Sequence, residues 1–366
     1  FPPQFLDEYD PGDIPLWLAE ALLQPDNAAF RHVAPALAWA LDLHGETRLL
    51  PLLIQGANHE NLDVRLWAVR TLAVMGETAA SVRPVLVDIL RQEPPAQLTP
   101  TDVIRWNKVR ASAAEALSTI GTEPESTVRL LIRMLEHSDE DIWRSSALAL
   151  GGMREKARPA IPALVEALAR DEASTPYAYY THHPVVRALG RIAGPAIPAL
   201  VKALQANQPT IRRRAAETLS LIREKEAALG ALTEAAYTDE DDEVRRLATL
   251  ALASPYGSVE NKTIVLSALI RIVNDKSPEV RAAAVRALAA LRPEEFPLRP
   301  FVNLFRDRDA NVRLAAVQAF SDLPLNNEIA SALEPLLSDS DPQVRARARA
   351  LHERLRDAWR NPAGVE

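Results

Sequence analysis

The sequence contains a ten-residue phrase that occurs twice with a single difference. Pro159–Leu168 reads PAIPALVEAL, and Pro195–Leu204 reads PAIPALVKAL. A second phrase is an aliphatic residue followed by arginine, and it recurs at Val64-Arg65, Val109-Arg110, Ile211-Arg212, Val244-Arg245, Val280-Arg281, Val312-Arg313 and Val344-Arg345. Ile142 and Thr181 hold the aliphatic place in two degenerate copies. A recurrence of roughly 30 to 45 residues is typical of two-helix repeats, so we expect the chain to be built from copies of one helical pair.

The apolar pattern within one copy shows why the copies must stack. Val280, Ala284 and Leu288 follow the spacing of one helix face, and the preceding helix carries its own apolar stripe from Ile264 to Val273. One pair of helices cannot bury both stripes by itself. Stacked pairs bury them continuously, so the sequence predicts an all-α fold, an α-solenoid of about ten antiparallel helix pairs.

Helix-capping residues stand three positions before the aliphatic residue of the repeat. They are Asn61, Asp139, Asp241, Ser277, Asp309 and Asp341. Side-chain oxygens of these residue types accept hydrogen bonds from the unpaired N–H groups at a helix start. We therefore expect the second helix of each pair, named here the B helix, to begin directly after them. The first helix is the A helix.

The composition excludes several classes of protein. Hydrophobic residues make up 48% of the chain and charged residues 25%, with only 12 glycines, which favours a helical protein with a true core. There is no cysteine, and hence no disulfide, thiolate zinc site or cysteine nucleophile. No uninterrupted apolar stretch is long enough to cross a membrane, so a soluble chain is expected. Because the first residue is Phe1, we expect a processed or trimmed product, either cytoplasmic or bacterial periplasmic.

A helix, an Asp-containing turn, and then Val-Arg at the start of an Ala/Leu-rich helix resemble HEAT repeats, particularly the bacterial type shared with phycobilisome lyases. The resemblance covers residues 13–358 and implies one right-handed superhelical domain, flanked by a proline-rich extended segment at 1–12 and a tail at 359–366. It also implies a ladder in which turn aspartates pair with B-helix arginines of neighbouring repeats. The ladder residues would be Asp241, Asp309, Asp341, Arg245, Arg281, Arg313 and Arg345.

Two insertions, Arg91–Thr101 and Arg170–Pro184, break the repeat between the two helices of their units. In a solenoid both must emerge along one edge, where Trp143 and His182 also replace the ladder arginine. Aromatic side chains on such an edge are favoured in protein interfaces. The candidate partner-binding residues are therefore Trp106, His137, Trp143, Tyr177, Tyr179, Tyr180, His182 and His183. The alternative is that the tyrosines only pack their long loop onto its own repeats.

Common signatures of catalysis and metal binding are missing from the sequence. There is no Gly-rich phosphate loop, Gly-x-Ser-x-Gly elbow or His-Glu-x-x-His motif. The acidic run Asp239–Glu243 lacks the glycine and the closing glutamate of a calcium loop. His182 and His183 are adjacent and would point to different faces of a helix. We expect no enzyme activity, no cofactor and no metal site.

The charge distribution argues against a nucleic-acid groove but leaves one basic segment to explain. The net charge is −7 and the isoelectric point is near 5.7, whereas a nucleic-acid groove needs clustered Lys and Arg. The last predicted helix, Val344–Arg360, carries arginine or another polar residue at most alternate positions. A polar terminal helix is typical of a solenoid cap. A nucleic-acid patch is the alternative interpretation.

The leading functional hypothesis is a protein-interaction scaffold or adaptor. Its partner would be another protein or a peptide segment, bound on the concave face lined by the B helices or on the aromatic edge of repeats 1 to 4. The alternatives are an accessory module of a larger enzyme, a bilin lyase-like chaperone implied by the resemblance, and a HEAT-like DNA-binding protein. The acidic net charge disfavours DNA binding.

Overall fold

The computed structural model describes residues 49–120, 125–170, 182–253, 259–291, 302–320 and 327–360. Every regular element in these ranges is a helix, which confirms the expected all-α solenoid. The contacts divide the chain into two compact units, Phe1–Ala196 and Ile197–Glu366, named unit 1 and unit 2. The opening helix pair predicted near 13–43 lies outside the described residues. A single domain over 13–358 stays a prediction.

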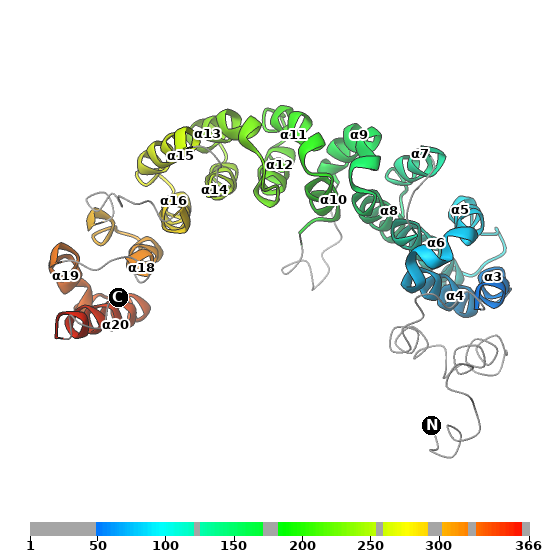
Figure 1. Ribbon diagram of the computed structural model, residues 1–366, viewed down its shortest axis with the longest axis horizontal. Coiled ribbons are helices and arrows are strands. Elements are labelled where there is room, and N and C mark those ends of the chain that lie inside the picture. The colour runs from blue at the N-terminus through cyan, green and yellow to red at the C-terminus, as the bar shows by residue number, and fades with distance from the viewer. Residues whose placement is uncertain are drawn as a thin grey trace, which may run out of the picture. The chain divides into compact units, whose positions relative to one another are not determined.

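Unit 1 is a series of antiparallel helix pairs. Its elements are α3 (Leu50–Ala57), α4 (Leu62–Met75), η3 (Gly76–Val82), α5 (Arg83–Arg91), α6 (Pro100–Thr119), α7 (Glu125–Met134), α8 (Glu140–Gly152), η4 (Arg154–Ala160), α9 (Ile161–Glu166), η5 (Ala167–Ala169), α10 (Pro184–Ile192) and η6 (Gly194–Ala196). The B helices α4, α6, α8 and α10 pack on one another in a row, and α5, α7 and α9 lie along one side of it (Figure 1).

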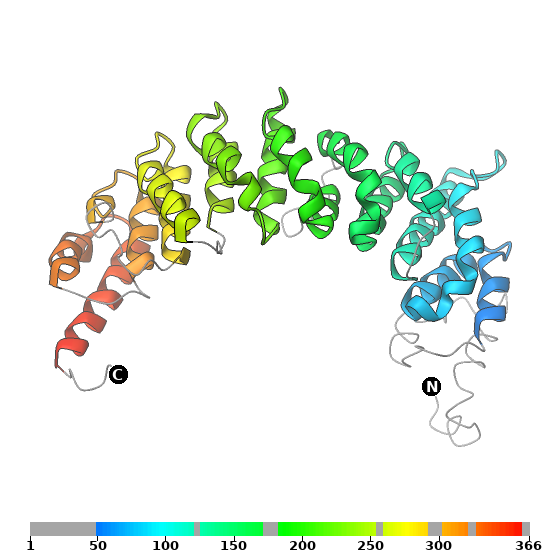
Figure 2. The ribbon, with the colours of Figure 1, turned by 45° about the horizontal axis from the view of Figure 1, so that its top comes forward.

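Unit 2 repeats this two-layer arrangement. Its elements are α11 (Ile197–Ala203), α12 (Pro209–Leu221), η7 (Glu226–Ala228), α13 (Leu229–Thr238), α14 (Asp242–Ala251), α15 (Val259–Ile272), α16 (Pro278–Leu291), α18 (Ala310–Ala319), α19 (Asn327–Leu333), η9 (Glu334–Ser338) and α20 (Pro342–Arg360). Here α12, α14, α16, α18 and α20 form the row of B helices, each packed on the next. Figure 2 shows α20, in red, at the end of this row.

The capping residues expected from the sequence set where the B helices begin. Asn61 accepts hydrogen bonds from the N–H groups of the first turn of α4, and Asp139 accepts one from Ile142 N–H at 3.3 Å. Asp241 and Asp309 cap α14 and α18 in the same way. Each cap satisfies donors that the helix itself cannot, so these predictions are confirmed.

Small side chains let consecutive B helices approach closely. The core of both units is dominated by alanine and leucine, and most of these side chains have no exposed surface. At the contact of α8 with α10, Gly151 faces Ala188 so closely that a Cβ atom on Gly151 would lie 2.6 Å from the Ala188 Cα. A residue with any side chain cannot occupy this position without moving one of the two helices.

Within the described residues, no single helix is long and apolar enough to cross a membrane. One sharply bent pair of segments, Pro184–Ile192 with Gly194–Ala203, is long and apolar enough for a membrane span only when its two segments are taken together.

Replacing Gly151 tests how tightly these helices pack. Gly151→Ala should lower the free energy of unfolding by about 1–3 kcal/mol, because backbone atoms block the added methyl group. The matched control is Gly230→Ala in α13, where an added Cβ meets nothing within 4 Å. There the loss of backbone freedom in the unfolded chain should give a gain of about 0.5–1 kcal/mol. Urea unfolding followed by circular dichroism measures both changes, and equal stability of Gly151→Ala and the wild type would contradict the packing argument.

Candidate functional site

The two helices of each pair meet at a turn, and in unit 2 a buried arginine links each turn to the next. Arg245 is only 2% exposed. Its Nε and Nη2 atoms donate to the Asp275 carboxylate at 3.0 and 3.1 Å, and its Nη1 donates to the carbonyl of Asp239 at 2.9 Å. The guanidinium therefore ties its own turn to the carboxylate of the following repeat. We call each arginine with its carboxylate a rung.

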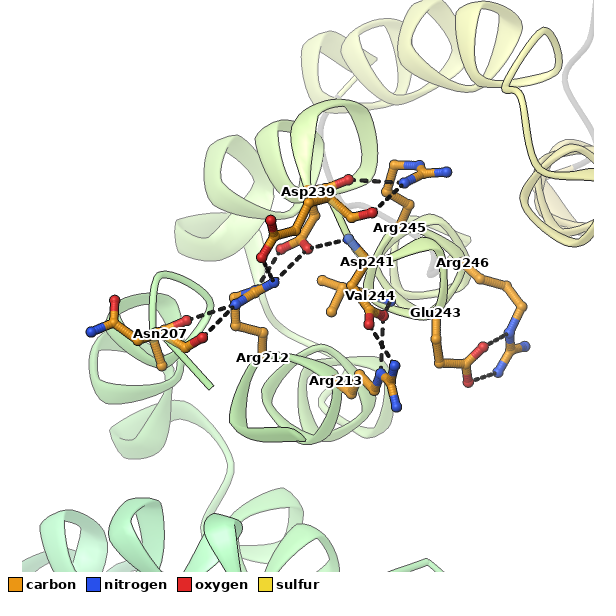
Figure 3. Close-up of polar contacts among 11 residues, drawn as sticks. Asn207, Arg212, Arg213, Asp239, Asp241, Glu243, Val244, Arg245 and Arg246 are labelled. Carbon is orange, nitrogen blue, oxygen red and sulfur yellow. Dashed lines mark hydrogen bonds and ion pairs between the residues drawn. The ribbon is translucent and has the colours of Figure 1, made fainter. Parts of the chain in front are cut away.

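The rungs of unit 2 share one geometry. They are Arg212 with Asp239, Arg245 with Asp275, Arg281 with Asp307, and Arg313 with Asp339. Both oxygens of each carboxylate are bound by one arginine, in contacts of 2.7 to 3.1 Å. Such paired contacts are among the stronger hydrogen bonds of proteins, because charge and planar geometry match on both sides. Figure 3 shows Arg212 between Asn207 of its own turn and Asp239 of the next.

The aspartates of the ladder differ from those that the sequence analysis assigned. Asp241, Asp309 and Asp341 do not hold the rung arginines; they cap the B helices. The rung carboxylate lies two residues earlier in each turn, where it also accepts the N–H of the capping residue, as Asp239 does from Asp241 at 2.9 Å. The correction has a physical reason. The buried rung arginine of the preceding repeat reaches the turn two residues before the cap, whereas the capping carboxylate lies beside the first turn of its own helix.

Two of these carboxylates have additional contacts that shift their ionisation. Asp241 also receives Arg213 Nε at 2.9 Å, and this hydrogen bond lowers the pKa of Asp241 below its usual value. Burial is the largest single influence on Asp307 and would raise its pKa, but the hydrogen bonds from Arg281 and the Asp309 N–H, together with the charges of Arg281 and Arg308, outweigh it and the pKa falls. Both groups are therefore held as carboxylates.

Unit 1 departs from this ladder at every turn that the structure describes. Arg65 donates to the carbonyl of Ala57 at 3.1 Å and to Gln92 at 3.2 Å in place of an aspartate, and its guanidinium lies 4.5 Å from the ring centre of Trp106. Arg110 binds both oxygens of Glu93, which belongs to the insertion that precedes its own helix. In these two repeats the arginine remains, but its partners are different.

A histidine takes the place of the rung aspartate in two turns of unit 1. His137 and His59 stand two residues before their caps, and each accepts the N–H of its cap through Nδ1 at 3.0 Å. His137 Nε2 lies 3.3 Å from Arg110 Nη1. Burial first, and then the nearby Arg110, lower the pKa of His137 below its ordinary value. The neutral imidazole can accept the turn N–H, whereas protonation of Nδ1 would remove this acceptor.

Trp143, which replaces the rung arginine of its repeat, is buried in the core and not displayed on an edge. Its side chain is 2% exposed. The guanidinium of Arg170 lies 5.0 Å from its ring centre, and the His183 ring stacks on it at 5.6 Å. Arg170 also donates to the carbonyls of Leu135 and His137, both at 2.8 Å. A later arginine thus reaches back and supplies the turn contacts that position 143 does not make.

The structure separates the remaining candidate residues. His183 is 7% exposed and packs on Trp143, so neither of these two is available at the surface for a partner. His182 precedes α10 and is exposed, because this B helix starts later in the repeat than the others. Trp106 and His137 are partly exposed. Tyr177, Tyr179 and Tyr180 lie outside the described residues.

Within the described residues, no group of three or more His, Cys, Asp or Glu side chains is placed to hold a metal ion.

Comparison with known proteins identifies the family. The family model for HEAT repeats matches residues 15–99, 107–176, 179–253 and 265–352. The chain belongs to the HEAT-repeat family. No curated protein matches it. HEAT repeats account for both helices of each pair and for the turn that carries the ladder.

Solved structures support the same fold for this HEAT-repeat chain. The karyopherin Kap121p bound to the extreme C-terminus of the protein phosphatase Cdc14p has a TM-score of 0.60 at 14% identity, covering 94% of this chain and 42% of Kap121p. Kap95p in a complex with RanGDP has a TM-score of 0.53 at 18% identity, covering 94% of this chain and 50% of Kap95p. This chain therefore spans about half the length of these karyopherins or less. A chain of the CpcE–CpcF phycocyanin lyase complex of Nostoc sp. PCC7120 has a TM-score of 0.35 at 24% identity. The match covers 53% of the present chain and 98% of the lyase chain.

Sequence reasoning missed several residues that shape this HEAT edge. Arg170 was noted only as the start of an insertion, and Asp275, Asp307 and Asp339 were not assigned to the ladder. The spacing offered a signal for the aspartates, because Asp-x-Asp or Asp-x-Ser recurs in the four turns that begin at Asp239, Asp275, Asp307 and Asp339. No local signal marks Arg170, since its contacts lie in the preceding repeat.

Removing one rung should destabilise unit 2 far more than removing a surface pair. Arg281→Met leaves the mostly buried Asp307 without its cation, and we expect a loss of about 3 kcal/mol or more in unfolding free energy. Adding Asp307→Asn should recover part of this loss, and a double-mutant cycle by urea unfolding measures the coupling. The control is Arg246→Met, which breaks a more exposed pair with Glu243 on the same helix and should cost less than about 1 kcal/mol. Equal losses in the two single variants would contradict the rung model.

The histidine at position 137 should make unit 1 sensitive to acid. Because the pKa of His137 is lower in the folded state, the unfolded chain binds more protons, and stability should fall as pH drops through and below about 6.5. His137→Asn keeps a neutral acceptor and should remove this dependence. His137→Asp should remove it as well and also gain stability, because it restores a carboxylate facing Arg110. Thermal melts between pH 5 and 8 compare the three proteins, and an unchanged acid dependence in His137→Asn would refute the assignment.

Proposed function

We propose that this HEAT-repeat chain is a binding scaffold, not a catalyst, and that it holds a protein partner on the first turns of α6. We name this segment, residues Pro100–Trp106, the α6 extension. Rung arginines elsewhere follow shortly after the start of their B helix, as Arg245 does in α14, whereas Arg110 lies deep within α6. The additional turns at the start of α6 are not explained by the stacking of repeats.

The single observation that carries the proposal is the exposure of Ile104. Its side chain is 55% exposed, the highest value among the large hydrophobic residues of the described part of the chain. Isolated surface hydrophobic residues need no explanation. Ile104, however, lies on a helix segment that departs from the repeat, and Trp106 in the same segment is also partly exposed.

The α6 extension is held in place before any partner binds. Thr99 caps it, accepting the N–H of Asp102 at 3.2 Å and donating to its carboxylate at 2.7 Å. Trp106 Nε1 donates to the carbonyl of Gln92 at 3.4 Å, and its ring lies against Arg65. A fixed apolar contact loses little conformational entropy on binding, which favours an interface anchor.

The face of the B-helix row is a weaker candidate near α12 and α14 of unit 2, because Arg213 and Arg246 are already paired there. Arg246 binds Glu243 through two contacts of 2.6 Å, and Arg213 binds Asp241 (Figure 3). The structure of Kap121p contains a bound phosphatase C-terminus, and that of Kap95p contains RanGDP. These neighbours support a protein as the class of partner for this chain.

The test compares two exposed isoleucines of the same chain. Ile104→Glu should abolish capture of the partner in a quantitative pull-down, because a charge replaces the apolar anchor. Ile264→Glu changes a similarly exposed residue, 44% accessible, on α15 of unit 2 and should leave capture unchanged. Trp106→Ala should weaken capture to an intermediate level. Thermal melts confirm that all variants remain folded, and identical capture by Ile104→Glu and Ile264→Glu would rule out the α6 extension as the binding site.

A further inference from the structure

Among the described residues, Arg345 is the last arginine of the ladder in unit 2, and its fork meets no carboxylate there. Arg345 of α20 makes the same contacts to its own turn as the other rung arginines, with Nη1 donating to the carbonyls of Asp339 and Ser340. In Arg313, Nε and Nη2 both bind a carboxylate of the next turn at 2.8 Å. Among the described residues, no carboxylate forms an ion pair with Arg345, so Nε and Nη2 are positioned for a partner that the described chain does not supply.

The helix face in line with Arg345 is basic where the earlier B helices are apolar. Four residues after the rung arginine stand Val285 in α16 and Val317 in α18, and both are fully buried under the next helix. Arg349 holds this position in α20 and is exposed, with one hydrogen bond to the carbonyl of Leu337 at 3.3 Å. His352 and Arg356 continue the same face along the helix. The terminal helix is therefore polar, and its polar surface carries mostly positive charge.

This concentration of charge contrasts with the rest of the chain. The helix α20 contains six arginines, Arg345, Arg347, Arg349, Arg354, Arg356 and Arg360, against Glu353 and Asp357. The whole chain has a net charge of −7. The helix α20 packs on α18, α19 and η9. A cap whose only role is solubility needs polar residues of either sign, and it does not need an oriented guanidinium fork.

We propose that this face of α20 binds an acidic helical segment of a partner protein, and that one carboxylate of the segment completes the rung at Arg345. Nη1 is already fixed by two carbonyls, so the fork is pre-organised for a planar carboxylate and loses little freedom on binding. Arg345, Arg349, His352 and Arg356 recur at helical spacing, which matches carboxylates on one face of another helix. The surface lies in unit 2 and is independent of the α6 extension.

A polypeptide carboxylate fits these observations better than a phosphate backbone. In the four other rungs of unit 2 the arginine fork binds an aspartate side chain in the same geometry. A carboxylate at Arg345 would therefore be bound as these four aspartates are. A nucleic acid would instead be held by distributed charge, with a steep dependence on salt.

The probe is a fluorescent alanine-rich helical peptide whose glutamates have the same spacing as Arg345, Arg349, His352 and Arg356. Binding to the full chain is measured by fluorescence anisotropy at low and at physiological ionic strength. Arg345→Gln should weaken binding by about tenfold, and Arg349→Gln by a smaller factor. Arg345→Lys keeps the charge, is less disruptive to the turn, and should also weaken binding because it removes the fork.

The control variant is Arg286→Gln on α16, an exposed arginine of the same unit with no ion pair among the described residues; it should bind like the wild type. A peptide of the same composition with scrambled glutamates should bind more weakly. The proposal is overturned if Arg345→Gln and Arg345→Lys bind normally, if the scrambled peptide binds equally well, or if a duplex DNA binds more tightly than the peptide. It is also overturned if a variant ending at Arg360 binds the peptide and the full chain does not, because the chain's own residues 361–366 would then occupy the face.

Discussion

A helical pair in this chain has two apolar stripes and only one partner helix of its own, so each pair must be covered by the next. This constraint produces the rows of B helices and the close contacts between them, such as that of Gly151 with Ala188. It also places every turn beside the turn of the following pair. Polar side chains at the turns are thereby removed from much of their water, and they require partners across the junction between repeats.

The arginine rungs meet that requirement in unit 2. Arg245 satisfies a carbonyl of its own turn and a carboxylate of the next turn with one side chain, and the carboxylate in turn accepts a backbone N–H. A buried pair of this kind contributes little net stability compared with an apolar pair of equal size, but it is costly to break on one side. The rungs therefore serve mainly to fix the register of successive repeats.

The departures from the ladder divide into structural repairs and surface features. Trp143 replaces a rung arginine, and Arg170 and His183 pack against its ring. This departure is therefore compensated within the core. The α6 extension and Arg345 are different, because the described neighbouring repeats account neither for the exposure of Ile104 nor for the fork of Arg345. The functional proposals depend on these two places, since stacking alone accounts for the regular repeats.

The sequence by itself determined the helix pairs, their period and the capping residues, because these depend on local backbone chemistry and on a pattern that repeats along the chain. It placed Asp139 and Asp241 at helix starts correctly. Only the tertiary structure decided which aspartate meets which arginine, and that Trp143 lies inside the core instead of on a binding edge. The physical reason is that these contacts join residues of different repeats. Their partners are selected by the distance and orientation of neighbouring turns, which no local pattern records.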